Sequence, residues 1–285
     1  MFDIVDSDVD VLRDASRHIL QAGGKRIRPR MVLLSHAATG SGDLSAAVPA
    51  AAAIELVHTA SVVHDDINDH GVVRRGRPSV NSIWGRTFAL LTGDFLFTKV
   101  YELMAPYGEL NALFAEATIA LVEGETLQAS AVKDKNLSRE VYHKIIERKT
   151  AALFKMGAEL GGRLSAAPEK QLEALRLYGN NIGLAFQIVD DILDLTGDPE
   201  QLGKTAGIDI EQGKGFAAVQ ENGGNGGDPM DAFKARLMQG NRIQQGRQQA
   251  QMLVETGIAA LDALPSTPYR DAMIELAQVV VNRSS

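Results

Sequence analysis

The sequence lacks the features of a secreted, disulfide-stabilised or membrane-spanning protein. It contains no cysteine, which excludes disulfide bonds and thiolate metal sites and fits a reducing compartment. No segment reaches the roughly 18 uninterrupted apolar residues that are typical of a membrane span. The N-terminus carries acidic residues where a secretory signal has basic and apolar ones. We therefore expect a cytoplasmic protein without a membrane span.

Aromatic residues are also scarce, at 5% of the chain, so the core must consist mainly of Ala, Leu, Val and Ile. An apolar fraction of 45% with 23% charged residues is ordinary for a globular protein. The 285 residues could form one large domain or two small ones, and we expect a single domain over residues 1–285. The net charge of -7 argues against a nucleic-acid partner, because phosphate backbones bind basic faces. An anionic ligand must therefore meet a local basic cluster.

Apolar residues three and four apart recur over most of the chain, whereas the alternation typical of strands is nearly absent. This pattern predicts an all-α, single-domain helical bundle. The expected helices cover residues 46–69, 83–104, 111–128, 139–160 and 171–195. Residues 221–229 contain four glycines and are predicted to form a loop.

Two acidic clusters with the pattern DDxxD end two of the predicted helices. The first contains Asp65, Asp66 and Asp69, and the second contains Asp190, Asp191 and Asp194. Helix positions i and i+4 lie about 40° apart around the axis and about 6 Å apart along it, so the outer aspartates of each cluster share a face. Such pairs suit magnesium, which is commonly shared between one or two carboxylates and substrate phosphates. One such cluster is as easily explained as a solvated helix end, but two identical clusters favour a shared ligand.

Two basic runs stand out in this acidic chain. The first, GGKRIRPR, contains Lys25 and Arg28, and the second, VVRRGRPS, contains Arg74 and Arg75. Arginine offers a planar fork for bidentate phosphate binding, whereas lysine acts as a point charge. The second run could merely neutralise the aspartates before it, but GGKRIRPR has no acidic residues beside it. Single lysines and a histidine extend the basic theme, although each alone is more often solvated or packed: Lys149, Lys204, Lys214 and His58.

Taken together, these motifs resemble the trans-isoprenyl diphosphate synthase family, also called polyprenyl synthetases. The resemblance runs through GGKRIRP, ELVHTASVVHDDIND, RRGRPSVN, GDFLFTKVYELM, EGETLQ, KTAALF, FQIVDDILDLTG and LGKTAGIDIEQGK, in the order of the family. It implies a helical fold around a deep central cavity, usually as a homodimer. It also implies a transferase that ionises an allylic diphosphate and joins the carbocation to isopentenyl diphosphate.

The resemblance further implies a role for each matching residue. Three magnesium ions, with Mn2+ as an alternative, would be held mainly by Asp65, Asp69 and Asp190, supported by Asp66 and Asp194. The allylic diphosphate would be gripped by Arg74, Lys149 and Lys204, and isopentenyl diphosphate would be held by Lys25, Arg28, His58 and Arg75, with Lys214 as a further substrate-binding residue. Thr150 and Gln187 would face the reacting carbons.

Small residues precede the first acidic cluster. Ala60 and Ser61 stand where short-chain members of the family commonly have a bulky aromatic residue, which implies a product longer than farnesyl. The aromatic residues Phe88, Phe95 and Tyr101 are candidates for the floor of the cavity. Alternatively, Ala60 only permits close helix packing.

The sequence departs from the family after Lys214, where GFAAVQENGGNGGDP replaces the usual helix. Three other functions remain open at this point. A terpene cyclase should lack GGKRIRP and should mix Asn, Ser or Thr into its second metal motif. A non-catalytic partner subunit of a heteromeric prenyl synthase often loses an aspartate motif, yet both are present. A protein that only sequesters prenyl diphosphates does not need the second acidic cluster.

Overall fold

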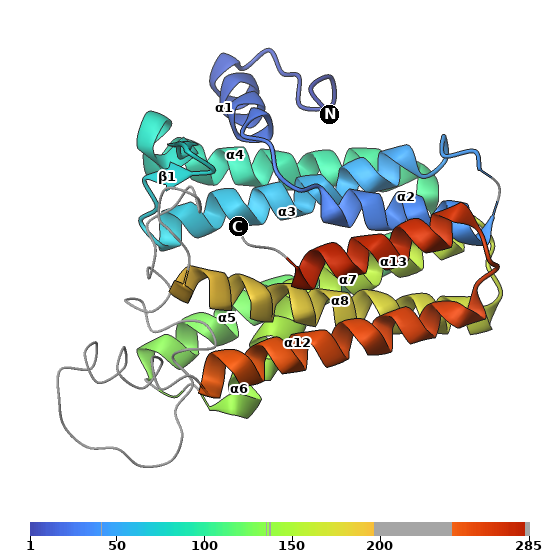
Figure 1. Cartoon of the computed structure of the whole chain (residues 1–285). Helices are drawn as coiled ribbons and strands as arrows, with labels where there is room; N and C mark the ends of the chain where they lie inside the picture. The colour runs from blue at the N-terminus through green and yellow to red at the C-terminus, as the bar shows by residue number, and fades with distance from the viewer. Residues whose placement is uncertain (41, 135, 137, 197–240, 283–285) are drawn as a thin grey trace.

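The computed structural model describes residues 1–282 except 41, 135, 137 and 197–240, and within these ranges the chain is a bundle of helices (Figure 1). The long helices are α1 (Asp10–Gln21), α2 (Ile27–Thr39), α3 (Val48–Asn68), α4 (Val80–Met104), α5 (Leu110–Lys133), α6 (Arg139–Ile146), α7 (Ala152–Leu164), α8 (Glu169–Thr196), α12 (Asn241–Ala260) and α13 (Pro268–Val281). Short helical turns follow α4, α6 and α12, namely η1 (Ala105–Tyr107), η2 (Glu147–Ala151) and η4 (Leu261–Ala263). The β-structure of the described residues is one antiparallel pair, β1 (Val73–Arg74) and β2 (Arg77–Pro78). The predicted all-α fold is confirmed.

Local capping chemistry explains where several helices begin. Ser79, Ser138 and Thr267 precede α4, α6 and α13, and each side-chain oxygen accepts a hydrogen bond from a backbone N–H of the first turn. Pro49 lies in the first turn of α3, where its missing N–H leaves no intrahelical bond unmade. Pro49 therefore marks the start of α3.

The buried apolar residues form two clusters that meet at α2 and α7. One cluster joins α8, α12 and α13 to α6, and the other joins α1, α3, α4 and α5. Helix α7 contributes to both, with Phe154 in the first cluster and Met156 in the second, and α2 does the same with Met31 and Val32. This shared layer fixes α3 relative to α8. The single-domain organisation of the whole chain stays a prediction.

Helices α3 and α8 run in the same direction, and their C-terminal ends lie at the same end of the bundle, on the left in Figure 1. These are the ends that carry the two DDxxD clusters. The β1–β2 hairpin follows α3 at this end of the molecule. The fold therefore brings both acidic clusters to one end.

Two helices differ from the sequence-based expectation. Gly85 has φ 81° and ψ 167°, which interrupts α4 near its start. The stretch expected as one helix over residues 139–160 is divided into α6 and α7 by η2, a π-helical turn that contains Lys149 and Thr150. Among the described residues, no helix is long and apolar enough to cross a membrane.

Candidate active site

The first acidic cluster occupies the C-terminal end of α3. Asp65 is half-buried, and Asp69 caps the helix by donating its backbone N–H to the Asp65 carbonyl at 2.8 Å. Asp66 is only 1% exposed and faces Arg74, whose Nε and Nη2 donate to Asp66 Oδ1 at 2.9 and 2.6 Å. Burial raises the pKa of Asp66 although Arg74 opposes this effect. Asp65 and Asp69 thus share the helix face expected for metal binding, while Asp66 anchors Arg74.

The β1–β2 hairpin connects this acidic end to the first basic run. Arg74 ends β1 and binds Asp66, and the next residue, Arg75, has a left-handed φ of 53°. Its Nη1 donates to the carbonyl oxygen of Gly23, in the loop before α2. Adjacent arginines therefore hold the acidic cluster and the basic loop in one assembly.

Lys149 reaches the first acidic cluster from η2. Its Nζ lies 2.7 Å from Glu125 Oε1, 3.7 Å from Asp65 Oδ2 and 2.8 Å from Gln128 Oε1. Burial would lower the pKa of Lys149, but Asp65 and Glu125 outweigh it and raise the pKa. Burial and the charge of Asp65 raise the pKa of Glu125 to about 7. Carboxylates crowded in this way suit a hard cation, so the donor set fits magnesium.

The π-helical turn η2 is held close to two neighbouring helices. A Cβ on Gly124 of α5 would lie 2.5 Å from the backbone nitrogen of Lys149, and one on Gly183 of α8 would lie 2.6 Å from Ala151 Cα. Only glycine permits these approaches. The absence of two side chains thus lets η2, with Lys149 and Thr150, pack closely between α5 and α8. Helical turns of the π type often occur at functional sites.

The second acidic cluster ends α8, with Asp191 and Asp194 buried and Asp190 half-buried. One turn before it, Gln187 accepts a 2.7 Å hydrogen bond from Thr150 Oγ1. The two residues predicted to face the reacting carbons therefore contact each other. Among the described residues, no group of three His, Asp or Glu side chains could hold an ion alone. Magnesium at this site would therefore take further ligands from substrate phosphates and water, as it commonly does.

Arg28 lies between the basic loop and the second acidic cluster. Its guanidinium carbon is 4.6 Å from the ring centroid of Phe154 and 5.8 Å from that of Phe186. Burial lowers the pKa of Arg28 to about 10, while the charges of Glu55 and Asp190 act in the opposite direction. Arg28 stays cationic near neutral pH and is available to an anionic ligand.

His58 faces the same group of cations. Burial, followed by the charge of Arg28 and then of Arg75, lowers the pKa of His58 well below its usual value. The imidazole is therefore neutral at pH 7. Lys25, in the loop before α2, is exposed. Arg28, His58 and Arg75, three of the predicted isopentenyl diphosphate residues, thus converge on one patch.

Glu55 is a functional candidate that sequence reasoning missed. Its carboxylate is 2% exposed and pairs with Arg26, whose Nη2 also donates to the Leu20 carbonyl at 2.9 Å. Arg26 has a left-handed φ of 48° directly before α2. The ion pair therefore fixes the loop between Gly23 and Arg28. Glu125 and Gln128 were also missed as site residues, although both lie in the EGETLQ motif.

The two residues predicted to control product length differ in exposure. Ala60 is fully buried within the apolar cluster of α3 and α4, whereas Ser61 is half-buried and donates its hydroxyl to the His58 carbonyl at 2.8 Å. Of the predicted floor residues, Phe88 and Tyr101 are exposed in the single chain, and Phe95 packs against the core.

The predicted site residues Lys204 and Lys214 and the predicted loop at residues 221–229 lie outside the described residues.

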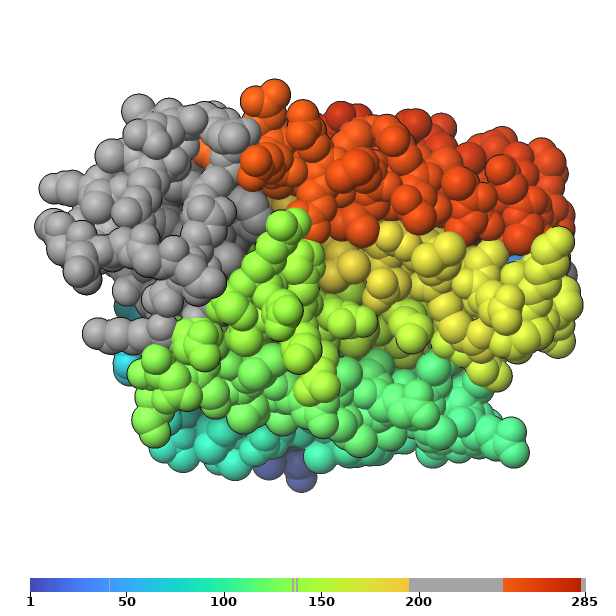
Figure 2. Space-filling model, turned by 90° about the horizontal axis from the view of Figure 1, so that it is seen from below, coloured from blue at the N-terminus to red at the C-terminus, as the bar shows by residue number. Residues whose placement is uncertain are grey.

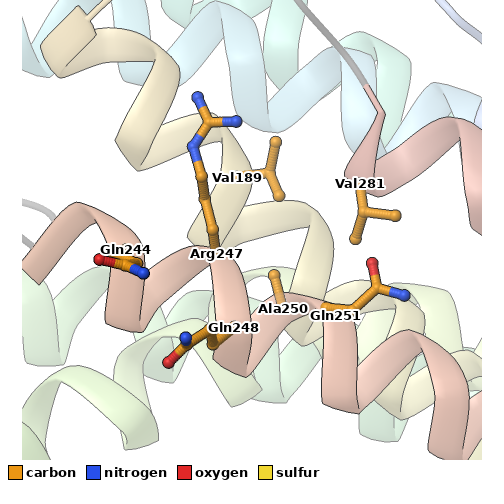
Figure 3. Close-up of a pocket in the computed structure, with 7 residues that line it drawn as sticks. All are labelled: Val189, Gln244, Arg247, Gln248, Ala250, Gln251 and Val281. Carbon is orange, nitrogen blue, oxygen red and sulfur yellow. The ribbon is translucent and has the colours of Figure 1, made fainter.

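A separate depression lies between α8, α12 and α13 (Figure 3). Its described lining consists of Val189, Gln244, Arg247, Gln248, Ala250, Gln251 and Val281. The described lining presents no carboxylate, so it lacks the ligands that magnesium prefers. The acidic ends of α3 and α8 remain the better candidate for the active site.

An all-helical bundle in which two acidic helix ends meet a cluster of arginines and lysines defines the class of helical isoprenoid synthases. The sequence pattern of the polyprenyl synthetase family matches residues 9–222. The chain belongs to this family, and it is a prenyltransferase. Magnesium dependence is a general property of the family.

Relatives in sequence cover almost the whole chain. The octaprenyl diphosphate synthase of Escherichia coli (strain K12) is 36% identical over 300 residues, which cover 98% of this chain and 92% of that protein. The all-trans-nonaprenyl-diphosphate synthase (geranyl-diphosphate specific) of Rhodobacter capsulatus is 35% identical over 297 residues, covering 98% and 91%.

Solved structures agree with this assignment. A polyprenyl synthase from Caulobacter crescentus CB15, complexed with calcium and isoprenyl diphosphate, superposes with a TM-score of 0.91 at 34% identity, covering 100% of this chain and 92% of that one. A decaprenyl diphosphate synthase from Rhodobacter capsulatus gives a TM-score of 0.89 at 32% identity, covering 100% and 94%. The fold predicted from the family resemblance is confirmed.

Proposed function

We propose that this protein lengthens an allylic diphosphate with isopentenyl diphosphate to give a trans-polyprenyl diphosphate longer than farnesyl. The observation that carries the proposal is the meeting of both acidic helix ends with cationic side chains at one site. Lys149 lies beside Asp65, and Arg28 is close enough to Asp190 for the carboxylate to affect its pKa. Names of the relatives, which include octaprenyl and nonaprenyl synthases, support a long product.

The chain's residues divide between the two substrates. Lys149 and Arg74 bind the allylic diphosphate, together with Lys204, while the carboxylates of Asp65, Asp69, Asp190 and Asp194 hold magnesium, with Asp66 acting through Arg74. We propose that three magnesium ions bind at this site and that Mn2+ can replace them. When held by these carboxylates, magnesium would neutralise the charge that develops on the leaving diphosphate. The calcium and isoprenyl diphosphate in the Caulobacter structure support a site for divalent cations and a diphosphate in this fold.

Isopentenyl diphosphate binds the opposite side of the site through Arg28, Arg75, His58 and Lys25, with Lys214 as a further contact. Phe154 and Phe186 surround the Arg28 guanidinium and keep water away from it. Holding both substrates in one orientation converts a bimolecular encounter into an oriented step. The allylic C–O bond breaks, the double bond of isopentenyl diphosphate forms the new C–C bond, and a proton leaves to the departing diphosphate.

A second candidate function follows from one relative. The heptaprenyl diphosphate synthase component 2 of Geobacillus stearothermophilus is 44% identical over 214 residues, covering 73% of this chain and 66% of that protein. A component of this kind works with a second polypeptide. The second candidate is therefore a non-catalytic partner subunit of a heteromeric prenyl synthase, inactive alone.

The purified protein tests both candidates. It is incubated with magnesium, radiolabelled isopentenyl diphosphate and, separately, dimethylallyl, geranyl, farnesyl or geranylgeranyl diphosphate, and the products are sized after dephosphorylation. We expect products longer than farnesyl that disappear when EDTA removes the metal and return when magnesium is restored. No product with any primer would contradict the proposal and favour the partner-subunit function.

We also propose that the protein is a homodimer that pairs through α4 and α5. Exposed apolar side chains line these consecutive helices, with Leu91 47% and Ile119 58% exposed, and Val122 beside Ile119 is similarly exposed. Figure 2 shows α4 and α5, in turquoise and green, away from α12 and α13, in orange and red. Exposed apolar side chains gathered on two consecutive helices support a protein interface there.

The double substitution Ile119→Glu and Val122→Glu should weaken the dimer by about 100-fold or more, because burying unpaired carboxylates costs several kcal/mol. Size-exclusion chromatography with light scattering at micromolar protein measures the change. The control is Val279→Glu, at an exposed position on α13. A dimer that survives the double substitution, or a control that dissociates, would place the interface elsewhere.

Two further expectations belong to this proposal. The single-domain organisation is supported by α2 and α7, which contribute to both apolar clusters. A cytoplasmic location is supported by the lack of cysteine, which fits a reducing compartment.

A further inference from the structure

Four side chains from three elements form a continuous hydrogen-bonded chain that leads into the candidate site. Tyr142 Oη of α6 donates to Asp191 Oδ2 of α8 at 2.7 Å, and Gln187 Nε2 donates to Asp191 Oδ1 at 2.7 Å. Gln187 Oε1 accepts from Thr150 Oγ1 of η2 at 2.7 Å. Tyr142, Asp191 and Thr150 are all buried. The chain ends at Thr150, one residue after Lys149.

The chemistry of a carboxylate sets the direction of every bond in this chain. An ionised carboxylate only accepts hydrogen bonds, so both the Tyr142 phenol and the Gln187 amide must donate to Asp191. The reversed amide would point its oxygen at a carboxylate oxygen, which is repulsive. Gln187 therefore presents its own oxygen to Thr150, and the Thr150 hydroxyl commits its hydrogen to Gln187. The lone pairs of Thr150 Oγ1 are left to face other groups.

Asp191 also occupies a different face of α8 from Asp190, the predicted principal metal ligand of its cluster. Adjacent helical residues are rotated by about 100°, whereas residues four apart are rotated by about 40°. Asp191 is therefore turned about 100° from Asp190 around the axis of α8, whereas it lies only about 40° from Gln187, one turn before it. The contact with Tyr142 shows that this second face is turned toward α6. The middle aspartate of the motif thus has a structural position of its own.

We propose that Asp191, supported by Tyr142, is a positioning residue that fixes the Gln187 amide and thereby aims the Thr150 oxygen lone pairs at the reacting carbons. This inference rests on the proposed function, because it assumes an allylic carbocation at Thr150. An oxygen lone pair directed at the cation stabilises it, whereas a hydroxyl hydrogen in the same place would destabilise it. The Thr150 oxygen stabilises the substrate only while the positive charge develops on the allylic carbon. Loss of this stabilisation should therefore lower kcat and leave substrate binding unchanged.

The test combines single substitutions with a double-mutant cycle. Asp191→Asn should lower kcat by about 10- to 100-fold, as expected for a misaligned catalytic group, with little change in KM for either substrate. Asn can also donate to the Gln187 oxygen, so the amide loses its single orientation. Tyr142→Phe, which removes one oxygen and should be milder for folding, is expected to lower kcat by less.

If Asp191 acts through Gln187, the double variant Asp191→Asn with Gln187→Met should be no slower than Gln187→Met alone. The magnesium concentration that gives half-maximal activity separates positioning from metal ligation. It should stay unchanged in Asp191→Asn and rise in the matched variant Asp190→Asn, one residue away. Thermal unfolding checks that each variant is folded.

Each outcome bears on a separate claim. Additive losses in the double variant, or a raised magnesium requirement in Asp191→Asn, would overturn the positioning role while an active wild type upholds the proposed function. A large KM change with unchanged kcat would also overturn it. A wild-type protein without turnover would overturn the proposed function, and the positioning role with it.

Discussion

Asp65→Asn should lower the rate of elongation by on the order of 10³-fold, which is the scale expected when electrostatic stabilisation of a leaving group is lost. The substitution keeps the shape of the side chain but removes the charge that pairs with Asp69 on the metal-binding face. It also removes the carboxylate that lies 3.7 Å from Lys149 Nζ. Lys149 would then bind Glu125 more strongly and be less available to the substrate.

The measurement is single-turnover conversion of an allylic diphosphate in saturating magnesium, compared with the wild type. The control is Asp262→Asn, which neutralises an exposed acidic residue in η4. Control activity should stay within twofold of wild type. If Asp65→Asn retained most of its activity while the control did too, the metal site would not include Asp65, and the proposed reaction would need other carboxylates.

Helix positions could be predicted largely from the sequence because the apolar period is strong. The expected helix at residues 46–69 corresponds to α3, and that at residues 171–195 corresponds to α8. The π-helical turn η2 could not be predicted, since it inserts into a continuous helical pattern without a change in composition. Its position depends on Gly124 and Gly183, which lie far away in the sequence.

The candidate site was predictable where spacing alone carries the information. The outer aspartates of each DDxxD cluster are examples, because helix geometry puts them on one face. The partners of Asp191 and Glu55 were not predictable in the same way. Tyr142 lies 49 residues from Asp191, and Glu55 lies 29 residues from Arg26, so only the folded chain brings them together. Such buried pairs have no sequence signature of their own.

Ser61→Phe should shorten the product by at least one five-carbon unit. Ser61 precedes Asp65 by four residues and therefore lies on the same face of α3 as the metal-binding carboxylate. It is half-buried rather than fully packed, so a ring there would extend toward the growing chain. Ala60 is the other residue that the family resemblance implicates in product length. Ala60 is fully buried, and a tyrosine there should instead cost about 1–3 kcal/mol of stability through overpacking.

Product sizing by reversed-phase chromatography, with thermal unfolding of each variant, separates the two effects. Ser61→Phe should give shorter products with a small change in Tm, whereas Ala60→Tyr should lower Tm first. Ser61→Ala serves as the control and should keep the wild-type product, because it adds no bulk. Shorter products from a stable Ala60→Tyr together with unchanged products from Ser61→Phe would contradict this assignment. The growing chain would then pass the Ala60 side of α3, and α4, which packs against that side, would have to move to admit it.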